Sequence, residues 1–431
     1  MVPGKPLGRC VSPRPARFRV RFALVEGGSG PVARGVWAGA HLIRWILYAT
    51  LASAPAVVLS AGCARTRYEN TAAFIEHPIR ARHDKTALLT FKACVLVPAR
   101  DILTLDPLWR ALFGDPAWNV VAGRVPNSSF WTRRSAEELQ PSRVARGPCT
   151  VPPPEPPFRL RKLRRGGGGR LSFVGTDARG RTFFFKPDAA NSPELGTTAT
   201  IVGSRILWAL GYNVPPVFLV TIRGTGDARL DGRRATAALF LDNVLGHFHF
   251  DWFRYRREVR GLRLASAWIN DTDRMGNNTL VLRRDGRAVY YLIDFDSCLG
   301  AWQGRAKEPW RGYRRQWCPR FPARPVPDVP IVSPALGRIA ARFDPLAWQP
   351  QAANNAFEHM TREDGVWMAA QIRRLGRPQL AAIIAQARLR DPADASRLLD
   401  ILLARRAAIL ARFAPADDAD TQPESCASNS R

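Results

Sequence analysis

The chain has 431 residues, of which 46% are hydrophobic and 23% are charged, so it is mostly globular and long enough for two or three domains. Its formal net charge is +28, from 64 Lys and Arg residues against 36 Asp and Glu residues. Only six of the basic residues are Lys, and the Arg residues are spread along the chain, so we expect no nucleic-acid partner beyond nonspecific attraction of polyanions.

Several common sites are absent from the sequence. The seven Cys residues form no C-x-x-C pair and show neither a zinc pattern nor a disulfide framework, although Cys94 and Cys149 are able to pair if the protein is exported. The motifs G-x-S-x-G and H-E-x-x-H and the Walker loop do not occur.

The N-terminal region, residues 1–62, predicts a signal peptide or a membrane anchor. Residues 1–44 are basic, and residues 45–62 form an uncharged, largely apolar run that ends before Cys63. Ala-Gly-Cys resembles the bacterial lipobox, which makes Cys63 a candidate lipidation site. An uncleaved anchor and a buried core helix remain alternatives. The basic residues before the run place the remainder outside the cytoplasmic membrane, in a bacterial cell envelope, with a cytoplasmic location as the alternative.

Residues 63–157 read as an N-terminal extension. Residues 106–113 predict a helix, and residues 125–134 form a polar and aromatic loop that either lines a site or packs at the surface. The Pro-rich residues 151–157 are a stiff spacer, which we take as the main domain boundary.

A run of four Gly residues, which includes Gly167 and Gly168, precedes strands expected at residues 171–174 and 182–186. Backbone N–H groups in such a run can cover phosphates, and a flexible linker is the alternative. Lys186 ends the second strand. Because the chain uses Arg almost everywhere, a Lys here indicates that a compact ammonium group is needed.

A helix is expected to open at Ser192-Pro193 and to end at Gly211. Glu194 is the only acidic residue in this segment. It is a candidate partner for Lys186, or it merely complements the helix dipole. Further strands are expected at residues 217–222 and 235–241.

Residues 247–251 alternate His-Phe-His-Phe-Asp, which is compatible with a metal site but is more typical of a surface segment. Residues 257–269 predict a helix that runs into the polar loop 270–278.

Two strand-like runs, residues 279–282 and 289–293, flank Asp285-Gly286 and predict a β-hairpin. The hairpin brings Asp273 and Asn278 close to Asp294, which follows the second strand. Carboxylate and amide oxygens at one sheet edge suit Mg²⁺.

The remaining chain predicts a helical lobe. Residues 302–321 are basic and aromatic and either hold an anionic substrate or pack against helices. Helices are expected over residues 362–375, 377–387 and 393–413, and the polar tail 415–431 is expected to be disordered.

The loop, the hairpin and the Asp-Phe that follows it resemble the catalytic and metal-binding loops of the protein-kinase-like superfamily. The Asp-Arg-x-x-x-Asn form is similar to the lipid kinases and HipA-like kinases, and Ile-Asp-Phe-Asp is similar to the aminoglycoside phosphotransferases. The resemblance implies a two-lobed α+β fold, with a small mixed β lobe and one helix at residues 158–243 and a larger helical lobe at residues 244–414.

By this resemblance Asp273 orients and deprotonates the acceptor, Lys186 reaches the nucleotide phosphates, and Asn278 and Asp294 hold Mg²⁺. The chain departs from the commonest pattern in two ways. No His precedes Asp273 in the usual position, and Asp296 replaces the Gly of Asp-Phe-Gly. Asp296 is either an extra metal ligand or the sign of a degenerate site.

The chain also looks like a group of uncharacterised bacterial proteins, and the matching residues are Pro126–Ser129, Arg134, Lys186, Pro193–Leu195, Asp273, Asn278 and Ile293–Phe295. The resemblance implies a phosphotransferase that uses ATP and Mg²⁺ and an acceptor that the sequence does not reveal. A domain outside the membrane meets little ATP, however. The alternative is therefore a noncatalytic envelope lipoprotein that uses a kinase-like fold as a binding module.

Overall fold

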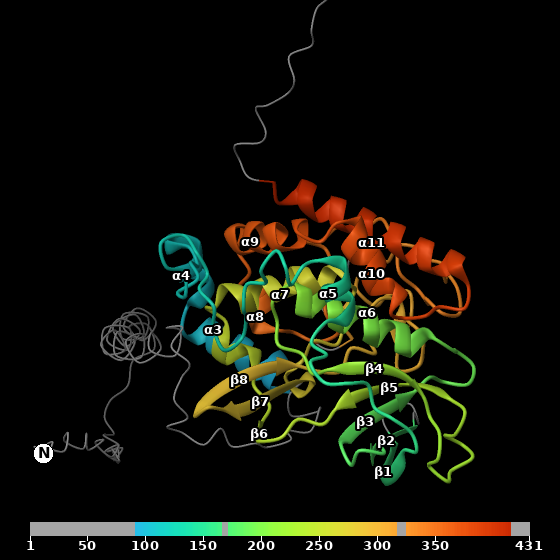
Figure 1. Ribbon diagram of the computed structural model, residues 1–431. Helices are drawn as coiled ribbons and strands as arrows, with labels where there is room; N and C mark the ends of the chain where they lie inside the picture. The colour runs from blue at the N-terminus through green and yellow to red at the C-terminus, as the bar shows by residue number, and fades with distance from the viewer. Residues whose placement is uncertain (1–90, 166–170, 317–324, 415–431) are drawn as a thin grey trace, which may run out of the picture. The chain divides into compact units, whose positions relative to one another are not determined.

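The computed structural model describes residues 91–165, 171–316 and 325–414 (Figure 1). The expectations for the N-terminal segment with Cys63, for Gly167 and Gly168, and for the C-terminal tail lie outside these residues. No helix in the described ranges is long and apolar enough to cross a membrane. The described ranges all belong to one compact unit, Cys63–Arg431. The domain boundaries expected after residues 157 and 243 stay predictions.

Five antiparallel strands form the first sheet, in the order β1-β2-β3-β5-β4. Their bounds are β1 Arg159–Arg165, β2 Leu171–Thr176, β3 Thr182–Pro187, β4 Val217–Thr221 and β5 Arg234–Leu239, which confirms the four predicted strands. Alternate Phe side chains of β2 and β3 point into a small core, where Phe173 and Phe185 stack with ring centroids 4.5 Å apart. Lys186 pairs in register with Thr236 of β5, so the rigid middle of the sheet positions it.

Helix α6 (Leu195–Ala209) is buried along its whole length and belongs to the larger core of the protein. Its start differs from the prediction, because Glu194, in the left-handed conformation, precedes the first turn in place of Ser192. The Asp188 carboxylate caps this end by accepting hydrogen bonds from the N–H groups of Glu194 and Thr197 and from the Thr197 hydroxyl, at 2.8–3.0 Å.

Helix α7 (Arg257–Trp268) leads through η4 (Gly276–Asn278) to the predicted hairpin, β7 (Thr279–Arg284) and β8 (Arg287–Leu292). Both turn residues have positive φ, 49° at Asp285 and 73° at Gly286, as a two-residue hairpin turn requires. Strand β6 (Val244–Gly246) pairs with β7 and completes a three-stranded sheet. The shorter elements are η3 (Phe250–Phe253), β9 (Ala301–Trp302) and β10 (Arg305–Ala306).

The C-terminal helices pack on the opposite side of α6 and α7 from the sheets (Figure 1). They are α9 (Arg362–Arg373), α10 (Arg377–Ala385) and α11 (Pro392–Arg412), which confirms the three predicted helices. The short helix α8 (Asn355–Glu358) instead packs against α7 and η3. Thr361 and Asp364 form a capping box at the start of α9, and Asp391 caps α11.

The N-terminal extension contributes η1 (Lys92–Leu96), α3 (Val97–Leu103), α4 (Asp106–Phe113) and α5 (Pro141–Arg146). The loop between α4 and α5 packs into the larger core and does not line a site. Phe130 stacks on Tyr290 with ring centroids 3.9 Å apart, and Trp131 donates a 2.6 Å hydrogen bond to the carbonyl of Leu210. Cys149 is a free buried thiol, so the suggested pairing of Cys94 with Cys149 is wrong.

We predict that Gly211→Ala strongly destabilises the fold. Gly211 has φ +106°, and a Cβ there would lie 2.2 Å from Nε1 of Trp131 and 2.6 Å from the carbonyl of Thr132. Backbone strain and overpacking together should lower the free energy of unfolding by about 2–5 kcal/mol, measured by urea denaturation. Gly180→Ala is the control, because Gly180 has φ +76° but open space around it. Equal losses in the two variants would contradict the packing argument.

Candidate active site

The end of α7 is held in place by Arg405 of α11. This buried guanidinium donates hydrogen bonds to the carbonyls of Ala267, Trp268 and Ala340 at 2.5–2.7 Å. Burial lowers the pKa of Arg405 to about 9. A cation at the C-terminus of a helix is favoured by the helix dipole, so Arg405 fixes the point from which the loop toward Asp273 starts.

Arg274 joins this loop to the end of β8. Its buried guanidinium pairs with Asp271, 2.6 Å between Nη2 and Oδ2. It also donates to three carbonyls, those of Asn278 (3.0 Å), Ile293 (2.7 Å) and Asp294 (3.1 Å). Arg274 was not predicted as a site residue, although it is the Arg of the Asp-Arg-x-x-x-Asn pattern and lies three positions after Asp271.

The loop and the hairpin bring Asp273, Asn278 and Asp294 together, as the sequence predicted. The amide nitrogen of the Asn278 side chain donates a 2.6 Å hydrogen bond to the carbonyl of Asp273, which leaves the amide oxygen available. The pKa of the Asp273 carboxyl is raised to about 7 by burial and by the negative charges of Asp294 and Asp271. Asp294 itself has φ 58°, a left-handed conformation that directs its side chain away from the course of β8.

Lys186 closes the other side of the site. Its ammonium lies 2.5 Å from Oδ1 of Asp294 and 3.0 Å from Oδ2 of Asp296. The Asp294 side chain is nevertheless 35% exposed, so a ligand can reach it. Burial and the Asp296 carboxylate raise the pKa of Asp294, and Lys186 opposes them.

Glu194 does not join this site, and its expected pairing with Lys186 is wrong. Its buried carboxylate lies 3.3 Å from Nε of Arg390 and 3.7 Å from Nη1 of Arg234. The left-handed conformation before α6 turns the side chain toward these guanidinium groups. Glu194 therefore acts at the junction of the sheet with the C-terminal helices and not at the phosphate-binding position.

The donor set fits a magnesium ion. Asp294 and Asp296 supply carboxylates and Asn278 supplies an amide oxygen, which are hard oxygen ligands of the kind that Mg²⁺ prefers. Burial, and after it the repulsion between the neighbouring carboxylates, raises the pKa values of Asp273 and Asp294. A divalent cation would relieve this repulsion.

Two other groups of side chains could bind a metal ion, but their members already form ion pairs or hydrogen bonds. In the segment considered for a metal, Asp251 binds Arg100 and Asn355, and His247 Nδ1 lies 2.5 Å from the carbonyl of Thr279. Ligand atoms of Asp101, Asp106 and His359 also come within 4.8 Å of one another.

In that second group, Asp101 pairs with Arg100 and Arg254, and Asp106 pairs with Arg110. These guanidinium groups already neutralise both carboxylates. The group therefore fastens the N-terminal helices to the body of the protein.

A cavity of about 430 Å³ lies between the N-terminal helices and the loop that follows Asp273. Arg274, Met275 and Gly276 form one wall, and residues of η1, α3 and α4, among them Ile102, form another. Its lining surface is mostly apolar, and it lies beside the loop that bears Asp273.

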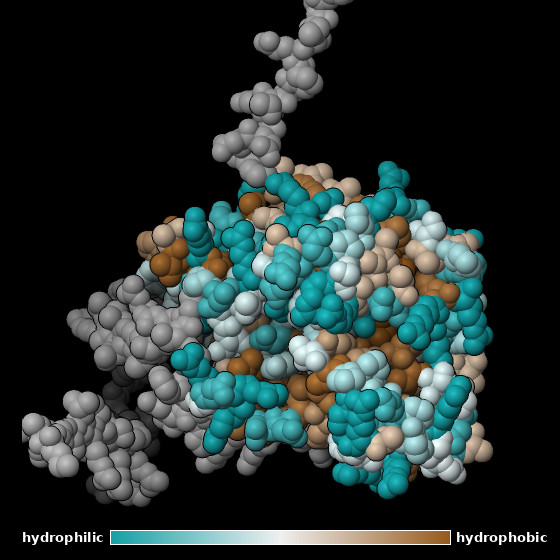
Figure 2. All heavy atoms as spheres, viewed as in Figure 1, coloured by the Kyte–Doolittle hydropathy of each residue, from teal (hydrophilic) through white to brown (hydrophobic). Residues whose placement is uncertain are grey.

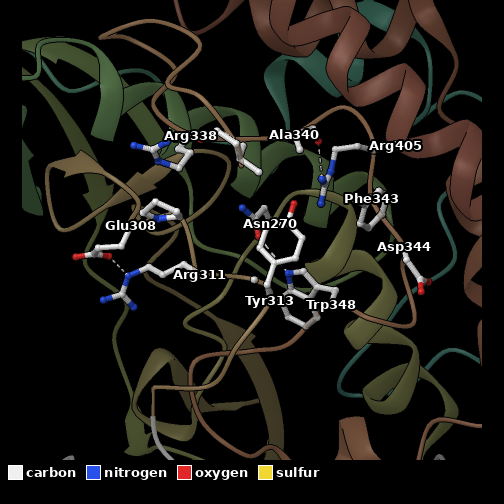
Figure 3. Close-up of a pocket in the computed structure, with 13 residues that line it drawn as sticks. Asn270, Glu308, Arg311, Tyr313, Arg338, Ala340, Phe343, Asp344, Trp348 and Arg405 are labelled. Carbon is white, nitrogen blue, oxygen red and sulfur yellow. Dashed lines mark hydrogen bonds and ion pairs between the residues drawn. The ribbon is translucent and has the colours of Figure 1, made fainter. Parts of the chain in front are cut away.

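The basic aromatic segment after β10 packs against the helical part. Arg311 donates a 2.9 Å hydrogen bond to the side-chain oxygen of Gln351, and Arg315 pairs with Glu358 of α8. Within the segment, Arg311 lies over the rings of Trp302 and Trp310, 3.5 and 4.4 Å from their centroids. Figure 3 shows a second pocket here, where Asn270, Tyr313, Trp348 and Arg405 converge. Its interior, about 10 Å³, has room for about one water molecule, so it does not hold a nucleotide.

No protein-family model and no curated protein matches the chain. Among solved structures it is similar to a Helicobacter pylori proinflammatory kinase, CtkA, with 14% identity and a TM-score of 0.36, over 59% of this chain and 96% of that chain. It is also similar to a chain of the Shewanella oneidensis MR-1 toxin–antitoxin complex of HipA, HipB and operator DNA, with 11% identity and a TM-score of 0.29, over 68% of this chain and 74% of that chain. At these identities the similarity to the two solved structures concerns the fold alone. The resemblance to a group of bacterial lipoproteins stays a prediction.

We predict that Arg274→Met costs about 3–5 kcal/mol of unfolding free energy, because it leaves Asp271 as a buried charge without its partner. Urea denaturation measures the loss. The double variant Arg274→Met with Asp271→Asn should recover part of it. The control is Arg377→Met, which breaks a pair with Asp400 in which both side chains are 62% exposed. Similar losses of unfolding free energy in Arg274→Met and in the control would contradict a stabilising role of the buried pair between Arg274 and Asp271.

In magnesium-free protein the carboxyl of Asp273 should titrate near pH 7, and Asp294→Asn should lower its pKa toward the usual 3.8. Carbon NMR of labelled Asp carboxyls measures both. Since the folded state keeps this proton to a higher pH than the unfolded chain, the contribution of Asp273 to the unfolding free energy falls between about pH 4 and 7. Asp285→Asn, in the exposed hairpin turn, should leave the titration unchanged. An unchanged pKa in Asp294→Asn would refute the coupling.

Proposed function

We propose that the protein is a phosphotransferase that uses ATP and Mg²⁺. The observation that carries the proposal is the convergence of Lys186 with Asp294 and Asp296, at 2.5 and 3.0 Å, beside the loop that bears Asp273 and Asn278. One cation, several carboxylates and an amide in this arrangement are what positioning of a nucleotide triphosphate requires.

The ion pairs of Lys186 suggest how the site accepts its ligand. Without nucleotide, the ammonium neutralises Asp294 and Asp296. A magnesium ion on these carboxylates would supply the charge that offsets the phosphates, and Lys186 would then be released to bind phosphate oxygens. This exchange of partners keeps the site close to electrically balanced, so nucleotide and metal are expected to bind together.

Asp273 is suited to accept the proton of an acceptor hydroxyl. A general base works best when its pKa lies near the working pH, and the pKa of Asp273 is raised to about 7. The bond from the side chain of Asn278 to the carbonyl of Asp273 holds the loop in the orientation that this role needs. The acceptor remains to be identified.

The second candidate is a noncatalytic binding module anchored in the cell envelope, with Cys63 as the lipidation site. The presence of Asp296 in place of a Gly favours it, because a second carboxylate on Lys186 strengthens the closed, ligand-free arrangement. A location outside the cytoplasmic membrane, where ATP is scarce, also agrees with this candidate.

We predict that MgATP raises the melting temperature of the wild-type protein and that Lys186→Ala and Asp294→Ala abolish the rise. At a hundred times the dissociation constant the stabilisation is about 2.7 kcal/mol, which thermal shift detects readily. The controls are Lys162→Ala and Asp285→Asn, which remove exposed charges of the same types and should respond like the wild type.

Asp273→Asn separates binding from transfer. It should keep the thermal shift while the transfer of labelled phosphate from ATP falls by about 10²–10⁴-fold, because the proton acceptor is lost. No shift in the wild type would refute the nucleotide site and favour the binding module. A shift with transfer unaffected by Asp273→Asn would refute the role of Asp273 alone.

A further inference from the structure

The outer face of α3 and α4 is apolar and open to solvent. The most exposed side chains are those of Leu103 (84%), Phe113 (68%), Ile102 (67%) and Leu112 (65%), and Leu108 and Trp109 accompany them. Figure 2 shows hydrophobic side chains gathered where Figure 1 places α4. Neither helix has a buried residue.

The polar residues of these helices face the protein instead. Arg100 of α3 binds Asp251 at 2.8 Å, and Asp101 binds Arg254 at 3.2 Å. In α4, Asp106 pairs with Arg110 of the same helix at 2.9 Å and lies 3.7 Å from Nη2 of Arg254, which joins α4 to the rest of the fold. The orientation is therefore fixed by ion pairs, and it is the reverse of the usual surface helix, whose apolar stripe faces the core.

An apolar face of this kind is costly in water. Each large side chain left exposed forgoes the free energy that its burial would give, and contiguous apolar patches on soluble proteins mark surfaces that bind something. The ion pairs hold the face outward, so the protein cannot cover it by rotating α4. The covering material must come from outside the described fold.

We propose that this face of α3 and α4 docks on the surface of an anionic lipid bilayer. The net charge of +28 complements an anionic surface. A helix that combines Leu, Trp and Phe on one face with Arg on the other has the composition of helices that lie in the membrane interface. The proposal is independent of the function proposed above.

The position of the face in the chain supports the same partner. The described fold begins at Phe91, directly before these helices, and the preceding sequence contains the apolar run 45–62. If this run enters a membrane, α3 lies within reach of it, because the 28 residues from 63 to 90 span at most about 100 Å.

The docked helices would lie flat on the bilayer. Helix α4 has 8 residues and is about 12 Å long, far short of the ~30 Å hydrocarbon core, so it cannot cross it. The paired Asp106 and Arg110 would stay on the protein side, and Trp109 would sit at the headgroup level.

The test measures amide hydrogen exchange of residues 97–113 in the full-length protein. It is recorded without vesicles, with phosphatidylcholine vesicles, and with vesicles that also contain phosphatidylglycerol. We expect exchange to slow by about tenfold on the anionic vesicles only. Leu108→Glu with Leu112→Glu should lose this protection. Phe240→Glu with Ile331→Glu, which changes residues 50% and 51% exposed elsewhere, should keep it.

Three results would overturn the proposal. Unchanged exchange in residues 97–113 while the protein sediments with vesicles would assign binding to other parts of the chain. Equal slowing on neutral vesicles would show that binding does not need an anionic surface. Equal slowing in the Glu variant would show that binding does not need the apolar face. Slowing that grows with protein concentration in the absence of vesicles would assign the face to a second copy. If the Glu variant does not fold, the comparison of the two vesicle types with the wild-type protein still tests the proposal.

Discussion

The candidate site depends on the buried ion pair between Arg274 and Asp271. Both side chains are fully buried, so each charge is tolerable only because the other is present. The other N–H groups of Arg274 donate hydrogen bonds to carbonyls at the end of β8. These bonds join the loop to the hairpin. The relative position of Asp273 and Asp294 follows from that link. The loop itself has few apolar side chains with which to pack, so it is held by hydrogen bonds from the Arg274 guanidinium and not by an apolar core.

Electrostatics in the site are arranged around a shortage of positive charge. The carboxylates of Asp294 and Asp296 both lie within 3.0 Å of one ammonium group, that of Lys186. Burial first, and the charges of Asp294 and Asp271 second, raise the pKa of their neighbour Asp273. Elsewhere in the fold, carboxylates such as Asp364 are matched by two guanidinium groups. This local deficit distinguishes a place that is ready to receive a cation from one that is merely structural.

Much of this arrangement was predictable because the signals are local. The Asp-Gly turn determined the hairpin, and the hairpin determined that Asp294 returns to the side of Asp273. The partner of Glu194 was not predictable, since Arg390 lies far along the chain and the left-handed residue before α6 redirects the carboxylate. The Asp-Arg-x-x-x-Asn pattern contains Arg274, but it does not indicate that this side chain is buried and joins the loop to the hairpin. For α4 the pattern indicates two faces but does not indicate which one the ion pairs turn inward.

The cavity beside Met275 and Gly276 has a wall that belongs to neither the sheet nor the helical part. That wall is formed by η1, α3 and α4, and ion pairs of Arg100 and Asp101 join it to Asp251 and Arg254. A molecule that enters this cavity therefore contacts the N-terminal helices as well as the loop that follows Asp273. High ionic strength, which weakens partly exposed ion pairs, would loosen this wall without disturbing the buried pair of Arg274 with Asp271. Under the proposed function, the N-terminal helices would then contribute to the choice of acceptor.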